Sequence, residues 1–156
     1  MMKEIAFAAT LSLAVLYNTV AGKAHETKIG SITIEHAWSR QAPRALDQAA
    51  GFMKITNSGA EDDRLVQATA AISAKVQLHD MMLVGEVMKM VELPGGIVIP
   101  AGQVVELKPR SLHVMFLDLE APPKEGEMFK GTLVFEKAGS VEVEYEVLAP
   151  NAGMGQ

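Results

Sequence analysis

Residues 127–148 read EMFKGTLVFEKAGSVEVEYEVL, and this stretch predicts the fold class. Leu133 and Phe135 occupy alternate positions before a turn at residues 137–140, and three valines and Tyr145 occupy alternate positions after it. Successive side chains of a strand point to opposite faces, so this period of two is typical of strands with one buried face. The stretch therefore predicts a β-hairpin.

The chain before this hairpin is also divided into short apolar runs by turn residues. The run IGSITIEHAWS is expected to be one strand, with Ile32, Ile34 and His36 on the same face. We count about eight or nine strands and no long amphipathic helix in the mature chain. This pattern predicts an all-β sandwich or small barrel in a single domain.

Composition excludes several classes of function. The formal net charge of −5 argues against nucleic-acid binding, because no basic stripe is present to neutralise phosphates. The sequence contains no cysteine, which excludes disulfides, zinc–thiolate sites and thiol catalysis within these residues. Asp62 and Asp63 are expected to be ordinary surface charges in a turn, because no other acid or histidine stands at a spacing suited to catalysis.

The N-terminal residues 1–24 have the layout of a secretory signal peptide. Lys3 precedes an apolar run, and Ala21 or Ala24 is a candidate cleavage point. An uncleaved membrane anchor is the alternative, although the run is shorter than the roughly 20 residues that cross a bilayer. We therefore expect an exported protein with a domain at residues 28–149 and a short tail at 150–156.

The stretch SLHVMFLDL, residues 111–119, places an imidazole beside a thioether. By the period of two, His113 and Met115 lie on one face of the expected strand. Four more methionines fall within ten residues, at positions 81, 82, 88 and 90. Neutral, polarizable thioether and imidazole ligands favour Cu(I) over zinc, calcium or magnesium. The pattern therefore indicates Cu(I) chemistry.

The stretch from LHDMM to RSLHVM resembles the PCu(A)C family of periplasmic copper chaperones. Ten residues separate His79 from Met90, as in that family, and His113-Val114-Met115 supplies its His-x-Met element. The gap from Met90 to His113 holds twenty-two residues, one more than usual. HAWSRQAP, GFMKITNSGAEDDRLV and GTLVFEKAGSVEVEYEV also resemble the family, so the similarity covers nearly all of the mature chain.

This resemblance implies a cupredoxin-like Greek-key β-sandwich or barrel that binds Cu(I) through His79, Met90, His113 and Met115. It implies a periplasmic, non-enzymatic chaperone that delivers copper to the binuclear site of cytochrome c oxidase. The expected partners are the copper-accepting oxidase subunit and a Sco-type thiol protein. A separate reductant is needed because a chain without cysteine cannot itself reduce a target's disulfide. We expect a monomer with no membrane span after cleavage.

Some assignments stay open. Met88 is either a reserve ligand or part of an apolar rim, His36 is expected to be structural, and His25 is a candidate Cu(II) ligand if cleavage follows Ala24. A blue-copper electron carrier would need a cysteine thiolate, and two histidines among thioethers make a poor catalytic zinc site. A non-metal β-sandwich that binds another envelope protein remains the alternative function.

Overall fold

The computed structural model describes residues 25–43 and 45–154, which form an all-β structure. The expected signal peptide, residues 1–24, lies outside this part of the chain. Within it, no helix has the length and hydropathy needed to span a bilayer. The eleven strands are β1 (Glu26–Ile29), β2 (Ile32–Arg40), β3 (Ala49–Asn57), β4 (Asp63–Ala70), β5 (Lys75–Val84), β6 (Val87–Glu92), β7 (Ile97–Ile99), β8 (Val104–Leu107), β9 (His113–Leu117), β10 (Met128–Phe135) and β11 (Gly139–Leu148).

The all-β class is confirmed, with more strands than the eight or nine expected. The strands β1, β7 and β8 contain only three or four residues each, so their alternation is too short to stand out in the sequence. The run expected as one strand at residues 29–39 also contains the turn between β1 and β2.

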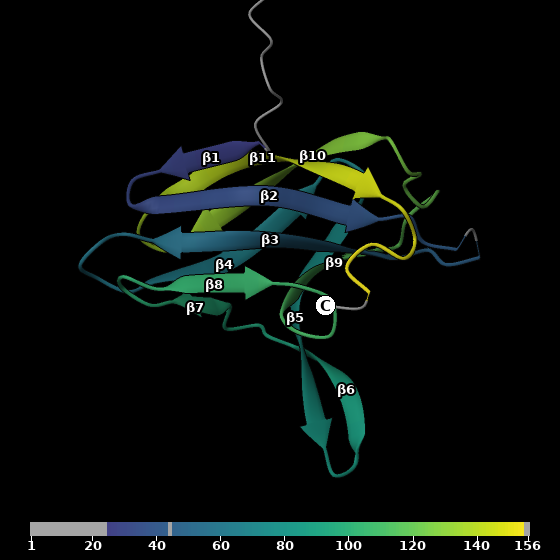
Figure 1. Cartoon of the computed structure of the whole chain (residues 1–156), viewed down its shortest axis with the longest axis horizontal. Helices are drawn as coiled ribbons and strands as arrows, with labels where there is room; N and C mark the ends of the chain where they lie inside the picture. The colour runs from purple at the N-terminus through teal and green to yellow at the C-terminus, as the bar shows by residue number, and fades with distance from the viewer. Residues whose placement is uncertain (1–24, 44, 155–156) are drawn as a thin grey trace, which may run out of the picture.

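The strands follow the hydrogen-bonded order β6-β5-β9-β3-β2-β11-β10-β4-β7, with β1 added to β2 and β8 added to β3. Every pairing is antiparallel except that of β11 with β2. The sheet curls over, so that β2, β3 and β8 lie in front of β4 and β10 in Figure 1. The hairpin of β5 and β6 extends away from this body, with β6 as an edge strand.

The β10–β11 hairpin supplies much of the core, as its alternation predicts. Leu133 and Phe135 of β10 are buried, and so are Val143, Tyr145 and Val147 of β11. The Tyr145 ring stacks on Phe129 at 4.9 Å between centroids and meets the Phe116 ring edge-on at 5.2 Å. These aromatic contacts join β11 to β10 and β9, and so connect the hairpin to the strand that carries His113.

The expectation that His36 shares a face with Ile32 and Ile34 is wrong. The pairing of β2 with β3 shifts register between Glu35 and Trp38, and His36 has a φ of 51°. Such a bulge inserts one extra residue and turns the following side chains over. His36 is therefore exposed, whereas Ile32 and Ile34 are buried.

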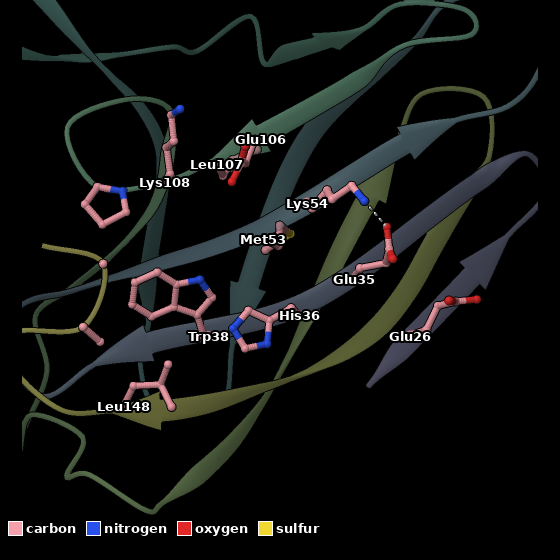
Figure 2. Close-up of a pocket in the computed structure, with 13 residues that line it drawn as sticks. Glu26, Glu35, His36, Trp38, Met53, Lys54, Glu106, Leu107, Lys108 and Leu148 are labelled. Atoms are coloured by element: carbon pink, nitrogen blue, oxygen red, sulfur yellow. Dashed lines mark ion pairs between the residues drawn. The ribbon is translucent and has the colours of Figure 1, made fainter. Parts of the chain in front are cut away.

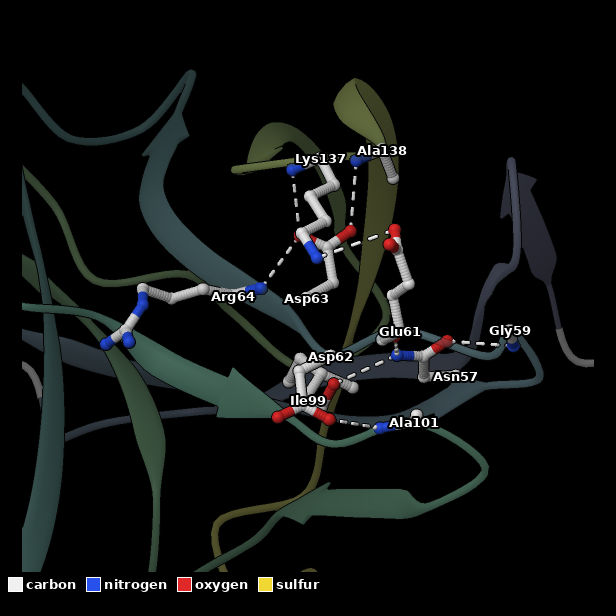
Figure 3. A network of polar contacts seen from close by, with 10 residues as sticks. All are labelled: Asn57, Gly59, Glu61, Asp62, Asp63, Arg64, Ile99, Ala101, Lys137 and Ala138. Carbon is white, nitrogen blue, oxygen red and sulfur yellow. Dashed lines mark hydrogen bonds and ion pairs between the residues drawn. The ribbon is translucent and has the colours of Figure 1, made fainter.

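Asp63 is buried and is not the surface charge that the sequence indicated. Its Oδ1 accepts hydrogen bonds from the backbone N–H groups of Arg64 (2.7 Å) and Lys137 (2.9 Å), and its Oδ2 accepts one from Ala138 (3.0 Å) (Figure 3). Burial raises its pKa, but the three N–H donors outweigh burial and hold the pKa below its ordinary value. Asp63 thus joins the start of β4 to the β10–β11 turn.

Candidate metal site

Three neighbouring strands, β6, β5 and β9, carry all four residues that the sequence singled out. In register, His79 of β5 lies opposite His113 of β9, and Met81 of β5 lies opposite Met90 of β6. Residues directly opposite one another in an antiparallel pair point to the same face, and so do residues two apart in one strand. His79, Met90, His113 and Met115 therefore share one face of these strands.

This face is turned away from the hydrophobic core, and we call it the outer face. Val114 and Phe116 alternate with the two candidate ligands of β9 and belong to the core on the opposite side. The period of two predicted this arrangement of β9. Beyond His79, β5 continues through the apolar residues 81–84 to the tip of the hairpin.

The two histidines are close enough to act together. Their ring centroids lie 5.6 Å apart with an interplanar angle of 65°, as expected for directly opposed residues. No spacing rule in the sequence revealed this pairing, because it depends on the register between β5 and β9.

In each imidazole, one ring nitrogen is hydrogen-bonded to an oxygen atom of the residue two positions earlier in the chain. His113 Nδ1 lies 2.8 Å from the Ser111 carbonyl oxygen, and His79 Nε2 lies 2.9 Å from Gln77 Oε1. A carbonyl oxygen only accepts, so these nitrogens carry the protons and the other nitrogen of each ring keeps its lone pair. His79 Nδ1 is buried and has no hydrogen-bond partner. A buried lone pair of this kind is suited to a metal ion.

The electrostatic surroundings keep His79 neutral. Burial lowers the pKa of its imidazole below the ordinary 6.5, because the charged form is the less well solvated, and nearby His113 lowers it further. Glu92, directly opposite on β6, raises the pKa by a smaller amount. Protons therefore compete weakly for the Nδ1 lone pair at neutral pH.

The two thioethers differ in exposure. Met115 is buried at 6% exposure and lies between Gln77 of β5 and Ala50 of β3. Met90 is 46% exposed and lies diagonally across from His79 on the edge strand β6. His113 and Met115 are thus covered by neighbouring residues on the outer face, whereas Met90 is the exposed thioether.

Several neighbours of the site were missed by the sequence reasoning. Phe52 lies beside His113 with 6.5 Å between ring centroids, and Trp38 packs on Phe52 at 4.6 Å. Gln77 and Ser111 hold the tautomers of the two histidines. The period of two could have indicated Gln77, which stands two residues before His79, whereas Phe52 comes from a strand distant in the sequence.

An open pocket of about 700 Å³ lies beside Trp38 and the exposed ring of His36, and it is lined by no residue of β5, β6 or β9 (Figure 2). Lys54 and Glu35, paired at 3.0 Å, also line it. The candidate ligands are not among its lining residues, so His36 and the pocket are separate from them. Across the described residues, no three His, Asp or Glu side chains are placed to hold a metal ion.

The family described as putative lipoprotein LpqE-like matches residues 32–147. A putative lipoprotein, Lxx21020, of Leifsonia xyli subsp. xyli (strain CTCB07) is 30% identical over 112 residues. This match covers 72% of the present chain and 66% of the relative, slightly less than two thirds of its length.

Solved structures share the fold. The copper-bound PCuAC domain from PmoF2 superposes with a TM-score of 0.69 at 32% identity, covering 81% of this chain and 99% of that domain. The solution structure of CuI-DR1885 from Deinococcus radiodurans gives a TM-score of 0.58 at 25% identity, covering 81% and 83% of the two chains. The expected cupredoxin-like β fold is thereby confirmed.

Proposed function

This chain belongs to the LpqE-like family and has the fold of PCuAC copper-binding domains, and we therefore propose that it is an exported Cu(I) chaperone. Its ligands are His79, Met90, His113 and Met115. The copper-bound state of two structural neighbours and the lipoprotein description of the family support the ion and the location in the cell envelope.

The main support for this proposal is the buried Nδ1 of His79, which has no hydrogen-bond partner and belongs to a ring that lies opposite the ring of His113. Two neutral imidazoles and two thioethers add no negative charge, so the loaded site holds the single charge of Cu(I). Soft sulfur ligands favour this ion over Zn²⁺, which usually takes three His or carboxylate ligands in a catalytic site. The donor set therefore supports binding and transfer of copper.

A Cu(I) titration of the mature domain against a chromophoric chelator tests the site, with Zn²⁺ as a competing ion. We expect Met90→Leu and His113→Gln each to weaken Cu(I) binding more than about tenfold, because each loses a bond worth over about 1.4 kcal/mol. The matched control is Met82→Leu, which changes an equally exposed methionine of β5 whose neighbour on β6 is Lys89. Parent-like affinity in both ligand variants would refute the assignment.

We further propose that the recipient is the copper-accepting subunit of cytochrome c oxidase. The exposed thioether of Met90 supports transfer, because an incoming ligand can reach the ion from the β6 side. Since the sequence contains no cysteine, a separate Sco-type protein would keep the recipient's thiols reduced.

Deletion of the gene under copper limitation tests this recipient. We expect less copper in the oxidase, restored by the parent gene but not by the His113→Gln variant. Unchanged oxidase copper in the deletion strain would exclude this recipient while leaving Cu(I) binding intact.

The apolar tip of the β5–β6 hairpin favours one other function, a non-metal interaction module of the envelope. Leu83, Val84 and Val87 at this tip are 66%, 50% and 57% exposed. If the titration shows no tight Cu(I) site, this alternative becomes the preferred one.

A further inference from the structure

The part of the β5–β6 hairpin beyond His79, residues 80–91, projects from the body of the molecule and is here called the arm (Figure 1). Four of its residues are methionines, and the proposed copper site uses only Met90. Methionine commonly fills gaps in a core. On the arm, however, Met82, Met88 and Met90 are each about half exposed, so packing does not account for them.

The register gathers three of these thioethers on one face. Met81 lies directly opposite Met90, and Met88 lies opposite Leu83, two residues farther along β5. Met88 is therefore the diagonal neighbour of Met81, at a separation of roughly 7–8 Å between backbone positions, which long flexible side chains can bridge. Met82 points to the other face, where its opposite residue is Lys89.

The same face carries the proposed copper ligands. His79 stands two residues before Met81 in β5, so the order from the tip inward is Met88, then Met81 with Met90, then His79 with His113. Exposure falls along this order, from 50% at Met88 to 5% at His113. Soft, neutral ligand atoms are thus spaced along this face from the exposed tip of the arm to the buried imidazoles.

We propose that Met81 and Met88 form a second Cu(I) site on the arm, with Met90 as a thioether that either site can use. The proposal rests on the proposed function, since it gives the ion a path to and from His79 and His113. Transfer is ligand exchange without electron transfer. A Cu–S bond to Met88 breaks as a bond to Met90 or to a histidine forms, and copper stays Cu(I).

The test is an anaerobic titration with Cu(I) of protein carrying ¹³C-methyl methionine, followed by NMR. The first equivalent is expected to shift the methyl signals of Met90 and Met115, and the second those of Met81 and Met88. In the double variant Met81→Leu, Met88→Leu, binding of the second Cu(I) equivalent is expected to disappear, while the first equivalent binds with unchanged affinity. Leucine has nearly the same volume, so the fold is retained. The matched control Met82→Leu keeps both events.

The outcomes separate this proposal from the proposed function. Shifts of Met90 and Met115 without any response of Met81 and Met88 would overturn the arm site and leave the chaperone site standing. A second event that survives in the double variant, or is lost in Met82→Leu, would also overturn it. Absence of any methionine shift would overturn both. Release of Cu(I) to excess chelator should also slow several-fold in the double variant, and an unchanged rate would overturn the transfer path.

Discussion

At the scale of the residue, the protonation of His79 is controlled by groups from two other strands. Burial and His113 of β9 lower its pKa below 6.5, whereas Glu92 of β6 partly opposes them. Cu(I) binds the neutral ring, so protons displace the ion only when the pH falls below the lowered pKa. Copper retention should therefore extend to more acidic pH than an ordinary imidazole would allow.

Glu92→Gln tests this control. Loss of the carboxylate removes the contribution that raises the pKa, so the titration midpoint of His79 in the copper-free protein moves to lower pH. The measurement is imidazole ¹⁵N NMR against pH, and acid release of Cu(I) should shift in the same direction. Glu144→Gln, which removes a carboxylate from β11, serves as the control. A midpoint that rises in Glu92→Gln would contradict the assigned role of Glu92.

At the scale of the element, a single carboxylate connects β4 with the β10–β11 turn. Both carboxylate oxygens of Asp63 accept hydrogen bonds from backbone N–H groups, two at Oδ1 and one at Oδ2. These donors come from Arg64 at the strand's own start and from Lys137 and Ala138 in the turn. These N–H groups lose their hydrogen bonds to water on folding, and the carboxylate of Asp63 takes the place of that water as the acceptor.

Asp63→Asn should destabilise the fold by about 1–3 kcal/mol, because the new amide NH₂ faces the Ala138 N–H and leaves a buried donor unsatisfied. Denaturant unfolding at neutral pH measures this, with Asp62→Asn as the control, since Asp62 accepts one exposed N–H from Ala101. Stabilisation by the ionised Asp63 is complete above its ordinary pKa of 3.8 and is lost as the pH falls through the lower folded pKa. The difference in unfolding free energy between the parent and Asp63→Asn should therefore shrink in acid. Equal stability of the two proteins at neutral pH would contradict the role assigned to Asp63.

At the scale of the whole molecule, the proposed copper site connects the edge of the sheet to its interior. Among the described strands, the edge strand β6 pairs only with β5, whereas β9 lies between β5 and β3. An ion bound to Met90, His79 and His113 would join β6, β5 and β9. Binding to the folded state alone also stabilises it, by about 2.7 kcal/mol at a free ligand concentration 100 times the Kd.

Hydrogen exchange tests this connection. In the copper-free protein we expect the β6 amides to exchange faster than those of β10 and β11, because an exposed edge strand opens locally. Cu(I) should slow exchange in β6 more than in the β10–β11 hairpin. Met90→Leu should lose this local protection, and protection of β6 that persists in the variant would contradict the connection.

Much of the fold could be predicted because its signals are local. The β10–β11 hairpin and the shared face of His113 and Met115 follow from alternation within a single strand. The positions of Asp63 and His36 could not be predicted. The first depends on contacts with a turn more than seventy residues later, and the second on a bulge in the pairing of β2 with β3.

Composition and alternation were enough to predict the all-β class, the β10–β11 hairpin and a soft, cysteine-free set of candidate ligands. Three features follow from the three-dimensional arrangement alone: His79 faces His113, Met115 is buried while Met90 is exposed, and Met81 and Met88 lie on the same face as these ligands. The period of two defines faces within a strand but not the register between strands. That register is selected by the packing of the whole sheet, and it brings together donors from β5, β6 and β9.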